Sequence, residues 1–172
     1  MPRFPFDKFS SANNKLSTQM KATGEVMSVG RTIEESLLKA VRSLEIGLNH
    51  IYMKKFDTRT EEELLDYIKD GTDDRIYAIA ELFRRGTDIG MICNATKIDM
   101  LFLEKLRSIV NEEKRRAAHT GDIDELYAAK KMGFSDECIG RLWGMRGDEV
   151  FALRAEHNMF PVYKMIDTCA SE

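Results

Sequence analysis

The sequence predicts an all-α protein, an irregular multi-helix bundle that follows a short, incomplete α/β remnant at the N-terminus. The three prolines stand near the ends, at positions 2, 5 and 161, so the long middle section lacks the residue most hostile to helix interiors. Apolar residues recur in that section at helical spacing, and glycines separate the runs. The composition, 43% hydrophobic and 32% charged, suits a set of amphipathic helices around one core.

Start and stop signals mark the first three helices. Thr32 with Glu35 and Thr60 with Glu63 have the spacing of a capping box, in which each end of the pair satisfies a free backbone amide. Gly47 stands where the chain would leave the first helix, and glycines at 71 and 86 end the next two. The expected buried faces are Leu37, Leu38, Val41 and Leu44; then Leu64, Leu65 and Ile68; then Ile76, Tyr77, Ile79, Ala80 and Phe83.

The second half of the chain continues the helical pattern, and about seven to nine helices are expected in the central domain, from near Ile46 to Phe160. A short helix is predicted over 88–94 and the longest over 99–118, where three basic residues near the end suit the negative end of the helix dipole. Shorter helices are predicted over 123–132, 136–142 and 148–157. The stretch 50–59 has the least regular pattern, and we expect it to be the most mobile loop.

The first thirty residues differ from the rest. Val26, Met27 and Val29 lie between two glycines and predict a short strand. A strand of this length needs partners, and little else in the chain has a strand pattern. The first thirty residues are therefore expected to form the edge of a larger folded domain.

Long motifs at both ends resemble one family. They are PRFPFDKF from Pro2, TQMKATGEVMSVGRTIEESLLKAVRSLE from Thr18, and HNMFPVYKMIDTCASE from His157. The first two resemble the end of the first ATP-grasp half of the carbamoyl phosphate synthetase large subunit, and the third resembles the opening of its second half. The resemblance implies three parts: a tail of the first, carboxyphosphate-forming half over 1–45, a helical oligomerisation domain over 46–160, and a junction over 161–172. Both ends of the chain are then expected to continue into a longer protein.

The resemblance also implies a function for the parent protein, an ATP-dependent ligase that makes carbamoyl phosphate from bicarbonate, glutamine-derived ammonia and two ATP. ATP and Mg²⁺ or Mn²⁺ would bind in the ATP-grasp halves, so no catalytic residue, cofactor or metal is expected in this chain, and none of the activity. Its expected role is to space the two halves and to self-associate. Expected partners are the rest of the large subunit and a glutaminase small subunit. The resemblance leaves open whether the parent enzyme serves arginine synthesis or pyrimidine synthesis.

Four residues are candidates for a role. The resemblance implies that Glu25 lies beside the internal tunnel of the parent; the alternative is a simple ion pair with Lys21 or Arg31. Phe83, Met91 and Ile92 are expected to be exposed apolar contributors to a self-association interface.

Other classes of function have weaker support in the sequence. The three histidines are far apart and lack ligand spacing, so they are interpreted as surface or capping residues. Cys138 is expected in the core, and Cys93 and Cys169 complete an odd, widely spaced set that favours reduced thiols. This pattern predicts a cytoplasmic location, and an organelle matrix would give the same pattern. A free-standing enzyme would have to bind ATP, yet the segment 24–32 lacks the spacing and the lysine of a phosphate loop.

The runner-up is a nucleic-acid-binding module, because 134–157 has the pattern of a helix-turn-helix. Its second helix would need basic or amide side chains near its start, but it opens with Asp148 and Glu149. A packed helical hairpin with Trp143 in or near the core is the preferred interpretation. A net charge of −3 gives no electrostatic reason to bind nucleic acid or an anionic membrane.

Overall fold

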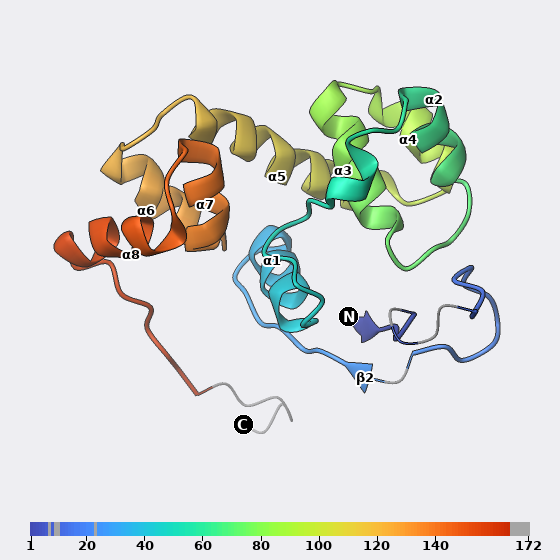
Figure 1. Cartoon of the computed structure of the whole chain (residues 1–172), viewed down its shortest axis with the longest axis horizontal. Helices are drawn as coiled ribbons and strands as arrows, with labels where there is room; N and C mark the ends of the chain where they lie inside the picture. The colour runs from blue at the N-terminus through green and yellow to red at the C-terminus, as the bar shows by residue number, and fades with distance from the viewer. Residues whose placement is uncertain (7, 9–10, 23, 166–172) are drawn as a thin grey trace.

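The computed structural model describes residues 1–6, 8, 11–22 and 24–165. In these residues the chain forms eight α-helices, one 3₁₀ turn and a two-stranded sheet (Figure 1). The all-α prediction is confirmed, and from residue 88 onward the predicted helices match the observed ones to within two residues at each end. The helices are α1 (Ile33–Ser43), α2 (Glu61–Tyr67), α3 (Arg75–Arg85), α4 (Ile89–Thr96), α5 (Met100–Ala117), α6 (Ile123–Lys131), α7 (Asp136–Trp143) and α8 (Gly147–Glu156).

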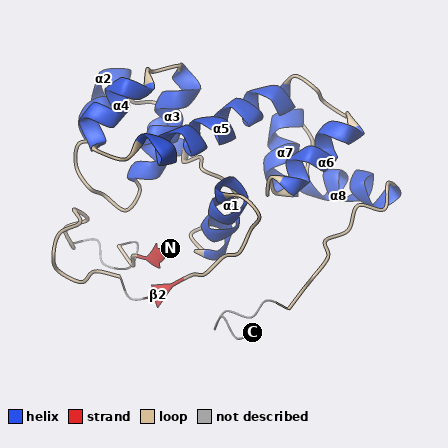
Figure 2. Ribbon diagram, turned by 180° about the vertical axis from the view of Figure 1, so that it is seen from behind, coloured by secondary structure: helices blue, strands red, loops and turns tan. Residues whose placement is uncertain are grey.

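The 18-residue helix α5 is the centre of the arrangement. Helices α3 and α4 pack against it and α2 packs on both, which forms a first helix group. Helices α6 and α7 contact α5 farther along and α8 packs on α7, which forms a second helix group. Figures 1 and 2 show the two groups at opposite ends of α5, with α1 crossing near its middle.

Local signals explain several helix ends. The predicted capping box is present at α2, where the Glu63 amide donates to Thr60 Oγ1 (3.2 Å) and the Thr60 amide donates to Glu63 Oε2 (2.8 Å). Gly86 ends α3 with a φ of 90°, in the left-handed region that glycine adopts without strain. The predicted stop at Gly47 is wrong: α1 ends at Ser43, and the chain turns at Glu45, which has a φ of 55°.

The predicted strand over residues 26–29 is also displaced. The observed strands are β1 (Pro2–Arg3) and β2 (Gly24–Glu25), which pair antiparallel. The Val26 amide adds one more bond, to the Met1 carbonyl (2.8 Å). Beyond it the chain turns toward α1, because the Ser28 hydroxyl donates to the Ser36 carbonyl (2.6 Å). Pairing therefore stops where the predicted strand would have begun.

The core runs through both helix groups. Its fully buried side chains come from all eight described helices and from the loops, and include Leu38, Leu64, Leu82, Ile92, Leu103, Ile109, Leu126, Phe134, Ile139 and Val150. The loop expected to be mobile contains a 3₁₀ turn, η1 (Lys54–Phe56). Burial of Ile51 and Phe56 anchors this loop in the core, contrary to expectation. Across the described residues, no helix is both long and apolar enough to cross a bilayer.

Candidate interaction surface

Apolar side chains are exposed in the first turns of α4 and α5, two helices that pack against each other. Met91 on α4 and Met100, Leu101 and Phe102 in the first turn of α5 are all between 42% and 54% exposed. We call these four residues the α4–α5 corner. Several exposed apolar side chains on two packed helices are typical of a protein contact surface rather than of isolated surface residues.

The structure corrects two of the three predicted interface residues. Phe83 is 4% exposed and Ile92 is fully buried, so both belong to the core rather than to the surface. Phe83 lies on the same face of α3 as Ile79 and Ala80, the face that packs inward. Met91 precedes Ile92 by one residue, about 100° around the helix, and is 51% exposed. Of the predicted set, only Met91 is available for contact.

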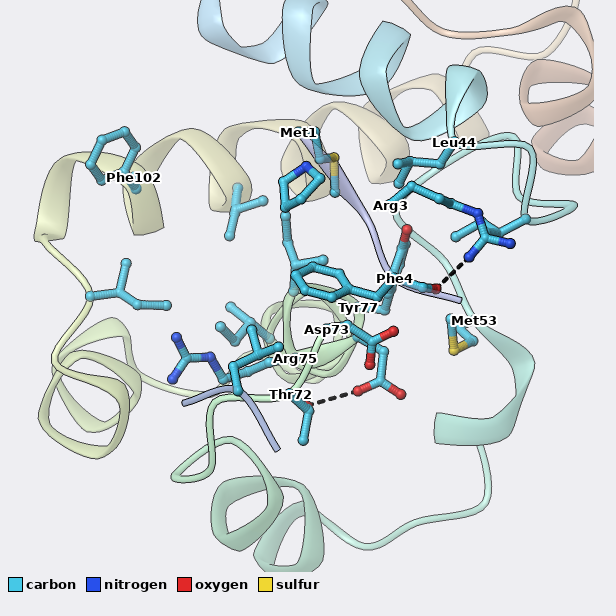
Figure 3. A pocket seen from close by; sticks show the side chains of 18 residues that line it. Met1, Arg3, Phe4, Leu44, Met53, Thr72, Asp73, Arg75, Tyr77 and Phe102 are labelled. Atoms are coloured by element: carbon cyan, nitrogen blue, oxygen red, sulfur yellow. Dashed lines mark hydrogen bonds between the residues drawn. The ribbon is translucent and has the colours of Figure 1, made fainter. Parts of the chain in front are cut away.

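A hollow of about 360 Å³ lies between the N-terminal segment and the bundle (Figure 3). Met1, Phe4 and Leu16 line it from the segment, and Tyr77 and Phe102 line it from helices α3 and α5. Figure 3 shows Phe4 beside Tyr77, with Phe102 farther off on α5. The first part of the chain therefore rests on the bundle through mostly apolar side chains.

A second hollow, of about 620 Å³, lies between α1 and α5. Ile33 and Leu37 line it from α1, and Phe102 and Leu106 line it from α5. Phe102 and Leu106 also line the first hollow. The two hollows thus share Phe102 and Leu106 on α5, and Phe102 also belongs to the α4–α5 corner.

Polar contacts fix the N-terminal segment to the loop between α2 and α3. The Leu16 amide donates to the Gly71 carbonyl (2.6 Å), and Lys15 Nζ lies 2.5 Å from Asp70. Lys15 also forms an isolated β-bridge with Thr72. The segment therefore follows the rim of the bundle instead of leaving it.

Asp74 stabilises the start of α3 from inside. Its carboxylate accepts hydrogen bonds from Tyr67 (2.6 Å) and Thr72 (2.8 Å) and pairs with Lys55, and Figure 3 shows the bond from Thr72. Burial alone would raise the pKa of Asp74, but these three donors outweigh burial and lower it. Burial, followed by the bond to Asp74, raises the pKa of Tyr67 to about 12. The four side chains join η1, α2 and the start of α3.

Glu25 lies on β2 at the surface, with its side chain exposed. The predicted alternative, an ion pair with Lys21 or Arg31, is not found among the described residues. Lys21 donates instead to the carbonyls of Asn13 (2.9 Å) and Lys15.

The sequence analysis did not predict a buried charge cluster formed by His50, Arg84 and Glu113. His119 and His157 are exposed, as expected, but His50 is only 3% exposed. His50 Nε2 lies 2.5 Å from the Glu113 carboxylate, which also accepts two bonds from Arg84. The three residues lie far apart in the sequence, so no local spacing signal connects them.

The segment 134–157 forms the packed hairpin that was preferred over a DNA-binding motif. Trp143 is 7% exposed, and its Nε1 donates to the Arg116 carbonyl on α5 (2.8 Å). Burial raises the pKa of the core thiol Cys138 to about 11, and Cys138 is the buried core residue predicted. At the start of α8, Arg146 is held by Asp148 (2.8 and 2.9 Å). Cys169 lies outside the described residues.

The fold is an all-α bundle built around one central helix. Exposed apolar side chains lie at the α4–α5 corner, and a cluster of charged side chains is buried in the interior. These are the features of a helical interaction module. The family described as "Carbamoyl-phosphate synthetase large chain, oligomerisation domain" matches residues 25–158. The chain belongs to this family.

Proposed function

We propose that this chain is the oligomerisation and spacer segment of a carbamoyl phosphate synthetase large subunit. In this proposal residues 1–45 belong to the first ATP-grasp half, 46–160 to the oligomerisation domain and 161–172 to the junction with the second half. The family match over 25–158 supports it. The N-terminal segment, strapped along the α2–α3 loop, gives the first half a fixed place on the bundle.

The parent subunit would form carbamoyl phosphate from bicarbonate, glutamine-derived ammonia and two ATP in the cytoplasm. ATP and Mg²⁺ or Mn²⁺ would be held by the two ATP-grasp halves, and a glutaminase small subunit would supply ammonia. The bundle would contribute spacing and self-association rather than chemistry.

The α4–α5 corner is the observation that carries the self-association part of the proposal. Met91, Met100 and Leu101 are apolar side chains that stay 42–54% exposed in the described structure. A stable interface needs roughly 1,000 Å² or more of buried surface. The corner would supply the apolar centre of such an interface, and the two hollows lined by Phe102 would extend it.

Sedimentation velocity across a concentration series tests this role. The wild-type chain is expected to show a concentration-dependent increase in sedimentation coefficient, and the double variant Met91→Asp/Leu101→Asp is expected to lose it. Phe151→Asp is the matched control, because Phe151 is 48% exposed on α8 in the second helix group. A strict monomer at high micromolar concentration, or equal loss in the control, would refute the assignment.

Glu25 keeps its proposed place beside the tunnel of the parent enzyme. Its exposed carboxylate, free of the two expected ion-pair partners, supports this role. In the whole enzyme, Glu25→Gln is expected to lower carbamoyl phosphate formed per glutamine hydrolysed, with unchanged thermal stability. If Glu25→Gln leaves the amount of carbamoyl phosphate formed per glutamine hydrolysed unchanged, Glu25 does not lie beside the tunnel.

A further inference from the structure

The buried cluster of His50, Arg84 and Glu113 lies where separate parts of the chain meet. Arg84 comes from α3, Glu113 from α5, and His50 from the loop that follows α1. Arg84 donates to both Glu113 oxygens (2.7 Å each), and its Nη2 also donates to the Ile51 carbonyl (2.8 Å). The carboxylate and the guanidinium therefore hold the loop against the first helix group.

The other side of His50 faces the second helix group. Its ring lies against the ring of Phe134, just before α7, with centroids 4.8 Å apart. Both ring nitrogens are buried and neither makes a well-aligned hydrogen bond among the described residues, although Nε2 lies within ion-pair distance of the Glu113 carboxylate. One imidazole thus contacts α5 through Nε2 and the second helix group through its face, and has no polar partner for its remaining nitrogen.

The charges around His50 are already balanced without a proton on the ring. Glu113 on α5 faces it with one negative charge, and Arg84 on α3 neutralises that charge. Arg141 on α7 adds a further positive charge nearby, and Cys138 on α7 carries a thiol that stays protonated. Glu81 on α3, 3.6 Å from Arg84, lies behind the guanidinium. A proton on His50 would therefore add an excess positive charge in a place that water does not reach.

We propose that His50 is an acid-sensitive latch between the two helix groups: the neutral imidazole holds the loop 47–53 and Phe134 against α5, and protonation releases them. The latch does not depend on the proposed function, because it uses only contacts within this bundle.

The direction of the effect follows from proton linkage. Burial, assisted by Arg84 and Arg141, lowers the pKa of His50 below its ordinary 6.5 despite the opposing effect of Glu113. In an opened loop the ring would regain about that ordinary value, so the open form binds the proton more readily. The equilibrium constant for opening then rises by up to about tenfold per pH unit as the pH falls below 6.5, until the closed form is protonated as well.

Hydrogen exchange tests the latch, with rates corrected for the intrinsic effect of pH. Peptides that cover 47–53 and 133–136 are expected to lose protection between pH 7 and pH 5.5 in the wild type. His50→Gln, which can still donate to Glu113 but cannot ionise, is expected to show no such change. His119→Gln, at an exposed ring bonded to the Arg115 carbonyl, is the matched control and should behave as the wild type. Equal acid sensitivity in His50→Gln, or none in the wild type, would overturn the proposal.

A second measurement tests the latch in the wild-type chain and does not require His50→Gln to fold. The ring protons of the three histidines can be titrated by NMR in the wild-type chain. Burial is expected to make His50 titrate below its ordinary pKa of 6.5. Titration of His50 at or above pH 6.5 would overturn the latch.

Discussion

Gly140 gives a prediction in which local helix propensity and tertiary packing have opposite signs. Gly140 lies inside α7, where alanine is favoured over glycine by about 1 kcal/mol. A Cβ at this position, however, would lie 2.6 Å from the Met145 carbonyl oxygen and 3.1 Å from the Arg146 carbonyl carbon. Both are backbone atoms of the turn between α7 and α8, which cannot move aside like the end of a flexible side chain.

The packing cost is expected to exceed the propensity gain. Overpacking costs roughly 1–3 kcal/mol, and the Met145 amide donates to the Gly140 carbonyl (2.8 Å), so relief of the clash would strain that bond as well. Because both clashing atoms belong to the backbone, the upper part of that range, about 2–3 kcal/mol, applies. Gly140→Ala should therefore lower the free energy of unfolding by about 1–2 kcal/mol after the propensity gain of about 1 kcal/mol is subtracted. For a domain of this size the midpoint of thermal unfolding would fall by roughly 2–8 °C.

Urea denaturation followed by fluorescence measures this change, because Trp143 is the chain's single tryptophan and lies in α7. Gly71→Ala is the control: its nearest neighbour would be Leu16 Cβ at 3.9 Å, an ordinary contact. The control should change stability by less than about 0.5 kcal/mol. A Gly140→Ala protein as stable as the wild type, or more stable, would refute the reasoning.

Three further predictions concern stability. Thr60→Ala removes one half of the α2 capping box and should cost about 1 kcal/mol in chemical denaturation, and no loss would contradict the cap. Ile109→Ala empties a fully buried site on α5 and should cost about 2–5 kcal/mol, whereas Met91→Ala at the exposed corner should cost less than about 0.5 kcal/mol. Burial would raise the pKa of Glu113, but Arg84 and His50 outweigh it and lower that pKa to about 2 from 4.5. The ionised Glu113 carboxylate stabilises the folded state fully above pH 4.5, and this stabilisation, about 3 kcal/mol, is lost as the pH falls toward 2. Thermal unfolding from pH 6 to pH 2 should show that loss, and Glu113→Gln should show less of it.

Much of the fold could be predicted because its signals are local. The Thr60 and Glu63 pair and the turn at Gly86 act within a few residues, and the periodicity of α5 depends only on that helix. The prediction was wrong where the position of an element depends on a partner that is distant in the sequence. Strand β2 lies earlier than expected because its pairing with β1 depends on Pro2 and Arg3, more than twenty residues away.

The candidate surface was less predictable than the fold. Periodicity identified Phe83 as part of an apolar face, but the neighbours of that face decide whether it is buried, and here α2 and α5 cover it. His50 pairs with Glu113 on α5, and Arg84 on α3 holds that carboxylate, so the position of the ring could not be inferred from nearby residues. The exposure of Met91 depends in the same way on how α4 packs.

The 18 residues of α5 span about 27 Å and belong to both helix groups at once. Insertion or deletion of a single residue in its middle would turn one group against the other by about 100° and shift it by about 1.5 Å. A change of seven residues would bring the faces back to within about 20°. Natural relatives should therefore vary in the length of their loops but keep the length of this helix, or change it only by two whole turns.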